Sequence, residues 1–284
     1  MTISVVLKGR LGNQLFQYAT LRSIGLKNNY NISINTNFEW HGQKCLLNHF
    51  NIPSNVFSNN NNNNNNFIYK YNQPAIADKY GCSNSTVHPS ILTIQDNTLL
   101  DGHFENEDFF KEHQHIIMNE LVLKDDIQNN NIEFINNIKK NNDNCVIVGI
   151  HIRRGDTYGY GFDENNVFEF INKSIDFIKK QNNNFFCILF VGGSRISHNE
   201  NNHQQDIDWI NAYSNTFSYK NIISPGTLSN DALLDFSLLT LCDYNILTWK
   251  STFSWMAAYV NKNNNITLVN KNCMLPPAEK FIVL

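Results

Sequence analysis

The segment CVIVGIHIRRGD, residues 145–156, decides the fold that the sequence predicts. Residues 145–152 form a near-continuous apolar run, which is typical of a strand buried on both faces of a parallel sheet. Polar groups gather at its end, because His151 lies near the end of the run and Arg153, Arg154 and Asp156 follow it. Ligands of open α/β sheets bind beyond the carboxyl ends of the strands. The segment therefore predicts a buried strand that ends in a ligand site.

Apolar runs and helical periodicities alternate from this strand to the carboxyl terminus. The alternation has βαβ spacing, so it predicts an α/β fold with a doubly wound, mostly parallel, Rossmann-like sheet in the carboxyl half. In the amino half, residues 3–7 predict a strand, residues 11–19 a helix and residues 28–37 a second strand. The polar stretch 141–144 separates the halves. We therefore expect two domains, over residues 1–143 and 144–284.

The composition excludes several classes of protein. The 284 residues include 22 Lys and Arg against 25 Asp and Glu, so no basic surface for nucleic acid is expected. The longest apolar run, residues 185–191, falls far short of the roughly 20 residues that a membrane helix needs. The amino terminus lacks a signal-peptide pattern, so we expect a cytoplasmic protein without a membrane anchor. The six cysteines form no CxxC pair and are interpreted as buried free thiols.

Asparagine is in excess, with 50 residues that include an unbroken run over 59–66. Such a bias occurs in disordered, prion-like chains, but the 20 Phe and 11 Tyr argue against disorder here. The alternative explanation is an AT-rich genome. In either case the run is expected in an exposed loop, where insertions are tolerated.

The groups after residues 145–152 have the chemistry of a diphosphate site. Arg153 and Arg154 offer planar guanidiniums, which bind phosphate through bidentate hydrogen bonds. This pattern favours a nucleotide-sugar ligand. The alternative is a structural ion pair at the end of the strand, in which Asp156 is the carboxylate.

A second anion site is predicted at the start of the helix expected over 251–261. Ser251 is a good N-cap, and the free N–H groups at a helix start bind anions. The alternative is ordinary capping with no ligand. The loop over residues 9–14 resembles a glycine-rich phosphate loop, but it lacks the GxGxxG pattern and the Walker lysine.

Asp206 and Asp208 form a D-x-D pair, which can hold a divalent metal on a sugar diphosphate. The alternative is that these carboxylates stand at the start of a helix, where acidic residues are favourable in any case. We favour the second interpretation and expect no metal site.

Taken together, these blocks resemble the α1,2-fucosyltransferase family, glycosyltransferase family 11. GRLGNQLFQYA at residues 9–19 is similar to the block that opens family members, and HIRRGD at residues 151–156 is similar to the H-x-RRGD hallmark. Residues 235–255, DFSLLTLCDYNILTWKSTFSW, and residues 102–110, GHFENEDFF, resemble two further blocks. The resemblance therefore extends over nearly the whole chain.

The resemblance implies a GT-B-like fold with two facing domains, in which the carboxyl half binds GDP-fucose and the amino half helps to bind the acceptor. It implies an inverting transfer of L-fucose from GDP-β-L-fucose to O2 of a galactose-containing glycan. No metal or other cofactor is expected, because arginines can stabilise the leaving diphosphate. Two alternatives stay open, namely a transferase for another GDP-deoxysugar or acceptor, and a non-catalytic nucleotide- or glycan-binding relative.

The resemblance also implies roles for individual residues. Arg153 is expected to contact the β-phosphate as the glycosidic bond breaks, and Arg154 is expected to pair with a carboxylate that fixes the loop. Asp156 is the first candidate for the general base, unless it is the partner of Arg154, and Asp163 and Glu164 are the alternatives. The expected donor-binding residues are Arg10, Gly12, Asn13, Gln14, His151, Arg154, Asp235, Ser251, Thr252 and Phe253.

Overall fold

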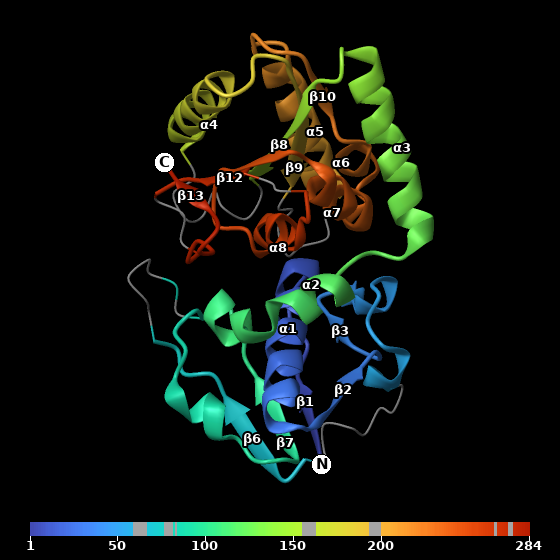
Figure 1. The fold of residues 1–284 in the computed structure, drawn as a ribbon, viewed down its shortest axis with the longest axis vertical. Coiled ribbons are helices and arrows are strands. Elements are labelled where there is room, and N and C mark those ends of the chain that lie inside the picture. The colour runs from blue at the N-terminus through green and yellow to red at the C-terminus, as the bar shows by residue number, and fades with distance from the viewer. Residues whose placement is uncertain are drawn as a thin grey trace. The chain divides into compact units, whose positions relative to one another are not determined.

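The computed structural model of the chain describes residues 1–58, 67–76, 82, 84–154, 163–192, 200–263, 266–271 and 275–284. The asparagine run at 59–66 and the candidate base Asp156 lie outside the described residues. The chain divides into two units, of which unit 1 comprises residues 1–124 and 274–278, and unit 2 comprises residues 125–273 and 279–284 (Figure 1). Among the described residues, no helix is both long and apolar enough to cross a membrane.

Unit 1 is built on a five-stranded parallel sheet in the order β5-β2-β1-β7-β6. Short apolar runs supply the central strands, in which Ile3, Ile34 and Leu100 are fully buried. The long helix α1 follows β1 and ends at Asn29, whose left-handed φ of 54° closes the helix. The strands and α-helices of the unit are β1 (Thr2–Val5), α1 (Leu11–Asn28), β2 (Asn31–Asn35), β3 (Glu39–Trp40), β4 (Gln43–Lys44), β5 (Phe57–Ser58), β6 (Tyr69–Asn72), β7 (Thr98–Asp101) and α2 (Gln114–Glu120).

Unit 2 is built on a six-stranded parallel sheet in the order β10-β9-β8-β11-β12-β13. The run at 145–152 forms the strand β8 as predicted, and β8 extends through Arg153. The elements of the unit are α3 (Asp125–Asn141), β8 (Val146–Arg153), α4 (Glu164–Lys179), β9 (Phe185–Gly192), α5 (Glu200–Ser214), β10 (Asn221–Ile223), α6 (Pro225–Ser229), α7 (Ala232–Leu241), β11 (Tyr244–Leu247), α8 (Thr252–Val260), β12 (Ile266–Val269) and β13 (Ile282–Val283).

Successive residues of β8 face opposite sides of the sheet. Ile150 and Ile152 belong to a core that also contains Ile175 of α4. The positions between them face α7, since a Cβ atom added at Gly149 would lie 3.2 Å from Leu239 Cδ2. Both faces of β8 are therefore covered, as its uninterrupted apolar character predicts.

The division between the units differs from the boundary predicted at 143/144. It falls after Lys124, because α3 packs against α7 and belongs to unit 2 (Figure 1). Lys139 of α3 pairs with Asp243 at 2.8 Å. The polar stretch 141–144 is a turn between α3 and β8, in which Asp143 and Asn144 adopt φ of 52° and 54°. A stretch that looks like a linker in the sequence is thus part of one folded unit.

Candidate functional site

The order of the strands in unit 2 places a topological switch point between β8 and β11. The chain proceeds from β8 to β9 and β10 on one side of the sheet, and from β11 to β12 and β13 on the other. In open α/β sheets, ligands bind beyond the carboxyl ends of the strands at such a switch point. The carboxyl ends of β8 and β11 are tied together, because the Thr248 hydroxyl donates to the His151 carbonyl at 3.1 Å.

Arg154 is fixed on the α5 side of the sheet. Its guanidinium donates to Asp206 Oδ1 at 3.0 Å and to the Gln205 carbonyl at 3.3 Å, and it lies 4.7 Å from the centre of the Trp209 ring. The side chains of Arg154 and Asp206 are only 13% and 5% exposed. The prediction that Arg154 pairs with a carboxylate is confirmed, and the carboxylate is Asp206. The alternative that pairs an arginine with Asp156 is not tested, because Asp156 lies outside the described residues.

Arg153 lies on the opposite face. It shares the parity of Gly149 and His151 along β8, and those positions face α7 and α8. The His151 ring lies 5.7 Å from the ring of Phe253 in the first turn of α8. Arg153 is half-buried. The two arginines therefore lie on opposite faces at the end of β8, and the ion pair of Arg154 joins this strand end to α5.

The His151 side chain is buried, and its environment keeps it neutral. Burial is the main cause, with the nearby Arg153 charge adding to it, and together they lower the pKa of His151 to about 3. A neutral imidazole has one nitrogen that donates a hydrogen bond and one that accepts. The neutral His151 ring can therefore form hydrogen bonds to a polar group without adding a positive charge to the site.

Helix α8 begins at the other side of the switch point. Ser251 caps it, since Ser251 Oγ accepts from the Ser254 N–H at 3.4 Å, and Thr252 is buried as the first helical residue. Phe253 packs edge-on against Phe236 at 5.7 Å. The structure therefore shows the capping that was the alternative to an anion site. The anion site at this helix start stays a prediction, because a cap satisfies only some of the terminal N–H groups.

Asp235 is buried and organises the turn after β10. Its Oδ1 accepts from the Ser224 hydroxyl at 2.5 Å and its Oδ2 from the Thr227 hydroxyl at 2.8 Å. Burial raises the pKa of Asp235 to about 7, although these hydrogen bonds act to lower it. Both carboxylate oxygens of Asp235 are bonded within the protein, and the donor contact predicted there stays a prediction. Ser224 and Thr227 were not predicted from the sequence as partners of Asp235. Their only sequence signal is that Ser224 stands at an N-cap position before Pro225.

In unit 1, the loop between β1 and α1 brings together the predicted residues of the glycine block. Gly9 has φ of +75°, and Arg10 is the N-cap of α1 without a capping bond from its side chain. Gly12 is buried in the first turn of α1. Asn13 Nδ2 lies 3.2 Å from His103 Nδ1, at the end of the neighbouring strand β7. The blocks at residues 9–19 and 102–110 therefore meet at one edge of this sheet.

Gln14 is a buried residue whose side chain holds the β1–α1 loop by hydrogen bonds. It is fully buried, its Nε2 donates to the Gly9 carbonyl at 3.3 Å and to the Lys44 carbonyl at 3.0 Å, and its Oε1 accepts from the Leu46 N–H at 3.0 Å. The sequence predicted a donor contact here. In the structure the Gln14 side chain joins the start of α1 to the chain after β4, and the donor contact stays a prediction.

The alternative base candidates are engaged in structural hydrogen bonds. Asp163 caps α4, with Oδ1 accepting from the Asn165 N–H at 2.9 Å and Oδ2 from Asn166 Nδ2 at 2.8 Å. Glu164 accepts from Trp209 Nε1 and from the Tyr213 hydroxyl, each at 2.9 Å. Both carboxylates therefore help to build the α4 and α5 layer.

The D-x-D pair is divided between two roles. Asp206 binds Arg154, and Asp208 Oδ1 accepts from Gln204 Nε2 at 2.8 Å. Over the described part of the chain, no group of three or more His, Cys, Asp and Glu side chains is suited to a metal ion. Four of the five described cysteines are buried free thiols as predicted, Cys45 is half-buried, and Cys273 lies outside the described residues.

Two α/β units, each built on a parallel sheet, agree with the GT-B-like fold that the sequence predicts. The family model described as Glycosyl transferase family 11 matches residues 1–281. The chain belongs to this family, which its sequence blocks resemble. Among curated proteins, none matches the chain significantly in sequence.

Solved structures of similar fold are fucosyltransferases. Fucosyltransferase NodZ from Bradyrhizobium is 15% identical, with 90% of this chain and 91% of that chain covered and a TM-score of 0.50. A mutant of Arabidopsis thaliana FUT1 in complex with GDP is 12% identical, with 94% and 69% covered and a TM-score of 0.51. POFUT1 in complex with GDP is 11% identical, with 94% and 97% covered and a TM-score of 0.53. At these identities the likeness concerns the fold, and the predicted GT-B-like α/β fold is confirmed.

Proposed function

We propose that the chain transfers L-fucose from GDP-β-L-fucose to O2 of a galactoside, with inversion at the anomeric carbon. Membership of glycosyl transferase family 11 supports the reaction class. The donor is supported by the fold shared with fucosyltransferase NodZ and with POFUT1 in complex with GDP-fucose. The cytoplasmic location stays a prediction from the sequence.

The placement of Arg153 is the observation that carries the proposal. It stands at the carboxyl end of β8, beside the switch point and on the face of α8, while Asp206 holds Arg154 on the other face. In the proposed reaction Arg153 donates to the β-phosphate and stabilises the charge that develops as the bond to fucose breaks. The first N–H groups of α8, near Ser251 and Thr252, complement the second phosphate. No metal or further cofactor is part of the proposal.

The remaining donor contacts are assigned from hydrogen-bonding capacity and from position next to the ends of the strands. We assign His151 and Phe253 to the nucleoside side of the site, because the neutral imidazole can both donate and accept. Arg10, Gly12 and Asn13 are the proposed contacts from unit 1, where they form the start of α1. Gln14, Asp235 and Arg154 act on the donor indirectly, by fixing the loops that carry these contacts.

Inversion needs one displacement, in which the acceptor oxygen attacks the anomeric carbon opposite GDP while a base accepts the hydroxyl proton. Asp156 is the proposed base. Asp163 and Glu164 are weaker candidates, because both oxygens of each carboxylate already accept hydrogen bonds.

The decisive experiment measures nucleotide release from GDP-fucose, GDP-mannose, and UDP- and dTDP-sugars, with galactoside acceptors and with EDTA present. We expect release from GDP-fucose only, unaffected by EDTA. Arg153→Ala should lower kcat about 100- to 1000-fold, as loss of a donor to a developing charge does elsewhere. Lys27→Ala is the matched control, because Lys27 is an exposed cation whose ion pair with Glu112 lies on the surface.

Other results of the nucleotide-release experiment would change the proposal in different ways. Release from a different GDP-sugar would replace fucose as the donor. Absence of release from every GDP-sugar, with Arg153→Ala equal to the wild type, would exclude a transferase and favour a binding protein. Loss of activity in EDTA would contradict charge stabilisation by arginine alone.

A further inference from the structure

Helix α5 adds an aromatic side chain to the ion pair at the end of β8. The centre of the Trp209 ring lies 4.7 Å from the Arg154 guanidinium, within the roughly 6 Å over which an indole face attracts a cation. Asp206, which accepts from Arg154 at 3.0 Å, precedes Trp209 by three residues. Residues at this spacing are neighbours on the surface of a helix. One face of α5 therefore holds Arg154 through both its charge and its flat guanidinium.

Trp209 is itself held by a carboxylate of α4. Its Nε1–H donates to Glu164 Oε1 at 2.9 Å, and Glu164 Oε2 accepts from the Tyr213 hydroxyl at 2.9 Å. A hydrogen bond to a carboxylate is stronger than one between neutral groups. It also polarises the indole, so that the ring presents more negative charge to the guanidinium. The contacts thus run in series from Glu164 through Trp209 to Arg154.

Aromatic neighbours limit the freedom of the Trp209 indole. Phe168 of α4 stacks on it with ring centres 5.7 Å apart and an angle of 19° between the planes. The Tyr213 ring of α5 lies 4.7 Å away. Offset or tilted pairs at these distances are favourable arrangements of aromatic rings. Groups from α4 and α5 together therefore fix the orientation of the indole.

The backbone of Arg154 is tied to the sheet as well. Its N–H donates to the Gly192 carbonyl at 2.8 Å, at the end of β9. Arg154 directly follows Arg153, the last residue of β8, whose side chain lies on the other face of the strand. The position of residue 154 therefore sets the point from which the Arg153 guanidinium extends. Such a setting matters for catalysis, because a displacement of about 1 Å at a reacting centre can cost a factor of about 100 in rate.

We propose that Trp209 and Glu164 are positioning residues for the phosphate contact of Arg153, an assignment that rests on the proposed function. Glu164 orients the indole, and the indole acts with Asp206 to fix the Arg154 guanidinium. Arg154 in turn holds the end of β8 against α5 and β9. Neither Trp209 nor Glu164 needs to touch the donor. Glu164 then acts through Trp209, and not as the general base.

A double-mutant cycle on GDP affinity, measured by calorimetry, tests this assignment. Trp209→Leu removes the ring and should raise the dissociation constant of GDP about tenfold, as weakening of a charge-assisted hydrogen bond does. Trp209→Phe keeps a ring without the indole N–H and should have a smaller effect. In an Arg153→Ala background, Trp209→Leu should change the dissociation constant less than about twofold, because the contact through which Trp209 acts is already absent.

Transfer kinetics separate positioning from general-base catalysis. Trp209→Leu should lower kcat by about tenfold or more, because Arg153 is then misplaced in the transition state. The KM for the galactoside acceptor should not change. Glu164→Gln should lower kcat and GDP affinity together, by about two- to threefold each, since the neutral amide polarises the indole less. Loss of a general base would instead lower kcat and leave GDP affinity unchanged.

Phe217→Leu is the matched control, because Phe217 belongs to the same aromatic layer and stacks on Tyr219 with ring centres 4.9 Å apart. It should lower the free energy of unfolding in urea and leave GDP affinity and kcat unchanged. Circular dichroism should show that all variants are folded.

Two results overturn the assignment. One is an equal effect of Trp209→Leu on GDP affinity with and without the Arg153 side chain. The other is a loss of GDP affinity in Phe217→Leu that matches the loss in Trp209→Leu. If the wild type binds GDP but releases no nucleotide from GDP-fucose, the proposed transferase activity fails, and the cycle on GDP affinity alone decides the positioning role. Absence of GDP binding by the wild type overturns both.

Discussion

At the scale of single residues, neighbouring arginines have separate tasks. Arg153 and Arg154 are adjacent in the chain, but the alternation of the strand sends their side chains to opposite faces of the sheet. Arg154 is held by Asp206 and Trp209, whereas Arg153 lies on the face of β8 that α7 and α8 cover. A motif that suggests two equivalent phosphate ligands therefore places its arginines in different surroundings, and Arg153 is the one that we propose as the phosphate ligand.

Asp206→Asn should destabilise the protein by about 3 kcal/mol, because it leaves the largely buried Arg154 guanidinium without its charge partner. Asp208→Asn is the control in the same D-x-D pair, since Asp208 bonds only to Gln204 at the surface in the described structure. It should change the free energy of unfolding by less than about 0.5 kcal/mol. Urea denaturation of both variants measures the difference, and equal effects would contradict the pairing.

Asp235 should make stability depend on pH. Its pKa is raised from 3.8 to about 7 in the folded state, so between pH 4 and 7 the folded state binds more protons than the unfolded state. Stability from this group is therefore present at low pH and is lost as the pH rises toward 7. Asp235→Asn cannot titrate. From pH 5 to 7.5 the wild type should lose about 3 kcal/mol more than this variant in urea denaturation, and parallel curves would refute the assignment.

At the scale of elements, the site depends on turns that hold unusual backbone conformations. The turn between β1 and α1 needs Gly9, because its φ is +75° and a Cβ atom there would lie 2.5 Å from Asn13 Nδ2. Asparagine serves the same purpose elsewhere. Asn29 and Asn230 end helices with left-handed φ, and Asn144 adopts the same conformation in the turn before β8. Part of the asparagine excess therefore has a conformational use.

Gly9→Ala should lower the free energy of unfolding by about 1–2 kcal/mol, through the left-handed φ and the contact with Asn13. Gly192→Ala is the control, because a Cβ atom at Gly192 would meet nothing within 4 Å. That change should be neutral within about 0.5 kcal/mol or slightly stabilising. Thermal and urea unfolding of the two variants measure these changes in the free energy of unfolding. Similar losses in both would show that the turn tolerates a side chain.

At the scale of the whole molecule, the chain passes between the units more than once. It leaves unit 1 after residue 124, returns to it for residues 274–278, and ends in unit 2 with β13 paired to β12. Sequence reasoning placed a single crossing at the polar stretch 141–144. Composition could not show that α3 belongs to the second unit, because the packing of α3 on α7 joins segments about a hundred residues apart.

The sequence by itself determined the class of fold, the buried strand β8 and the family, because strand periodicity and short motifs are local properties. It also indicated that an arginine would pair with a carboxylate. Only the tertiary structure decided the partners. Asp206 lies 52 residues from Arg154 in the sequence. Neither segment alone contains the strand order that brings the two side chains together.

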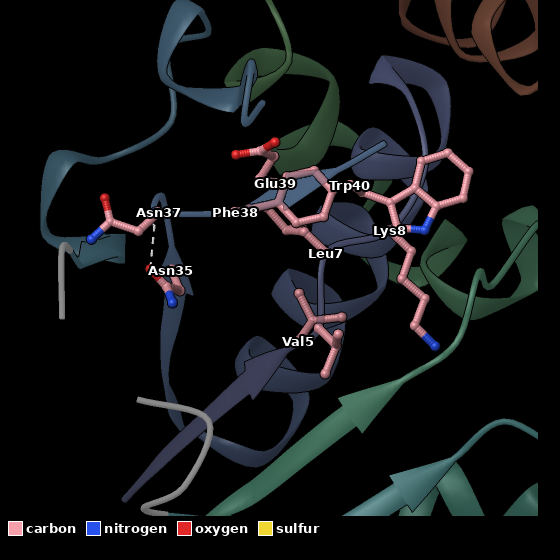
Figure 2. Close-up of a pocket in the computed structure, with 9 residues that line it drawn as sticks. Val5, Leu7, Lys8, Asn35, Asn37, Phe38, Glu39 and Trp40 are labelled. Atoms are coloured by element: carbon pink, nitrogen blue, oxygen red, sulfur yellow. Dashed lines mark hydrogen bonds between the residues drawn. The ribbon is translucent and has the colours of Figure 1, made fainter. Parts of the chain in front are cut away.

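The same reason explains the other differences. The bonds of Asp235 to Ser224 and Thr227, the bonds of Gln14 to the chain after β4, and a cavity of about 350 Å³ that Trp40 lines in unit 1 (Figure 2) arise where separate loops meet at the carboxyl edge of a sheet. A local pattern fixes which way a side chain points along its own strand. Non-local pairing then decides which groups that side chain contacts, and a local sequence pattern does not contain this information.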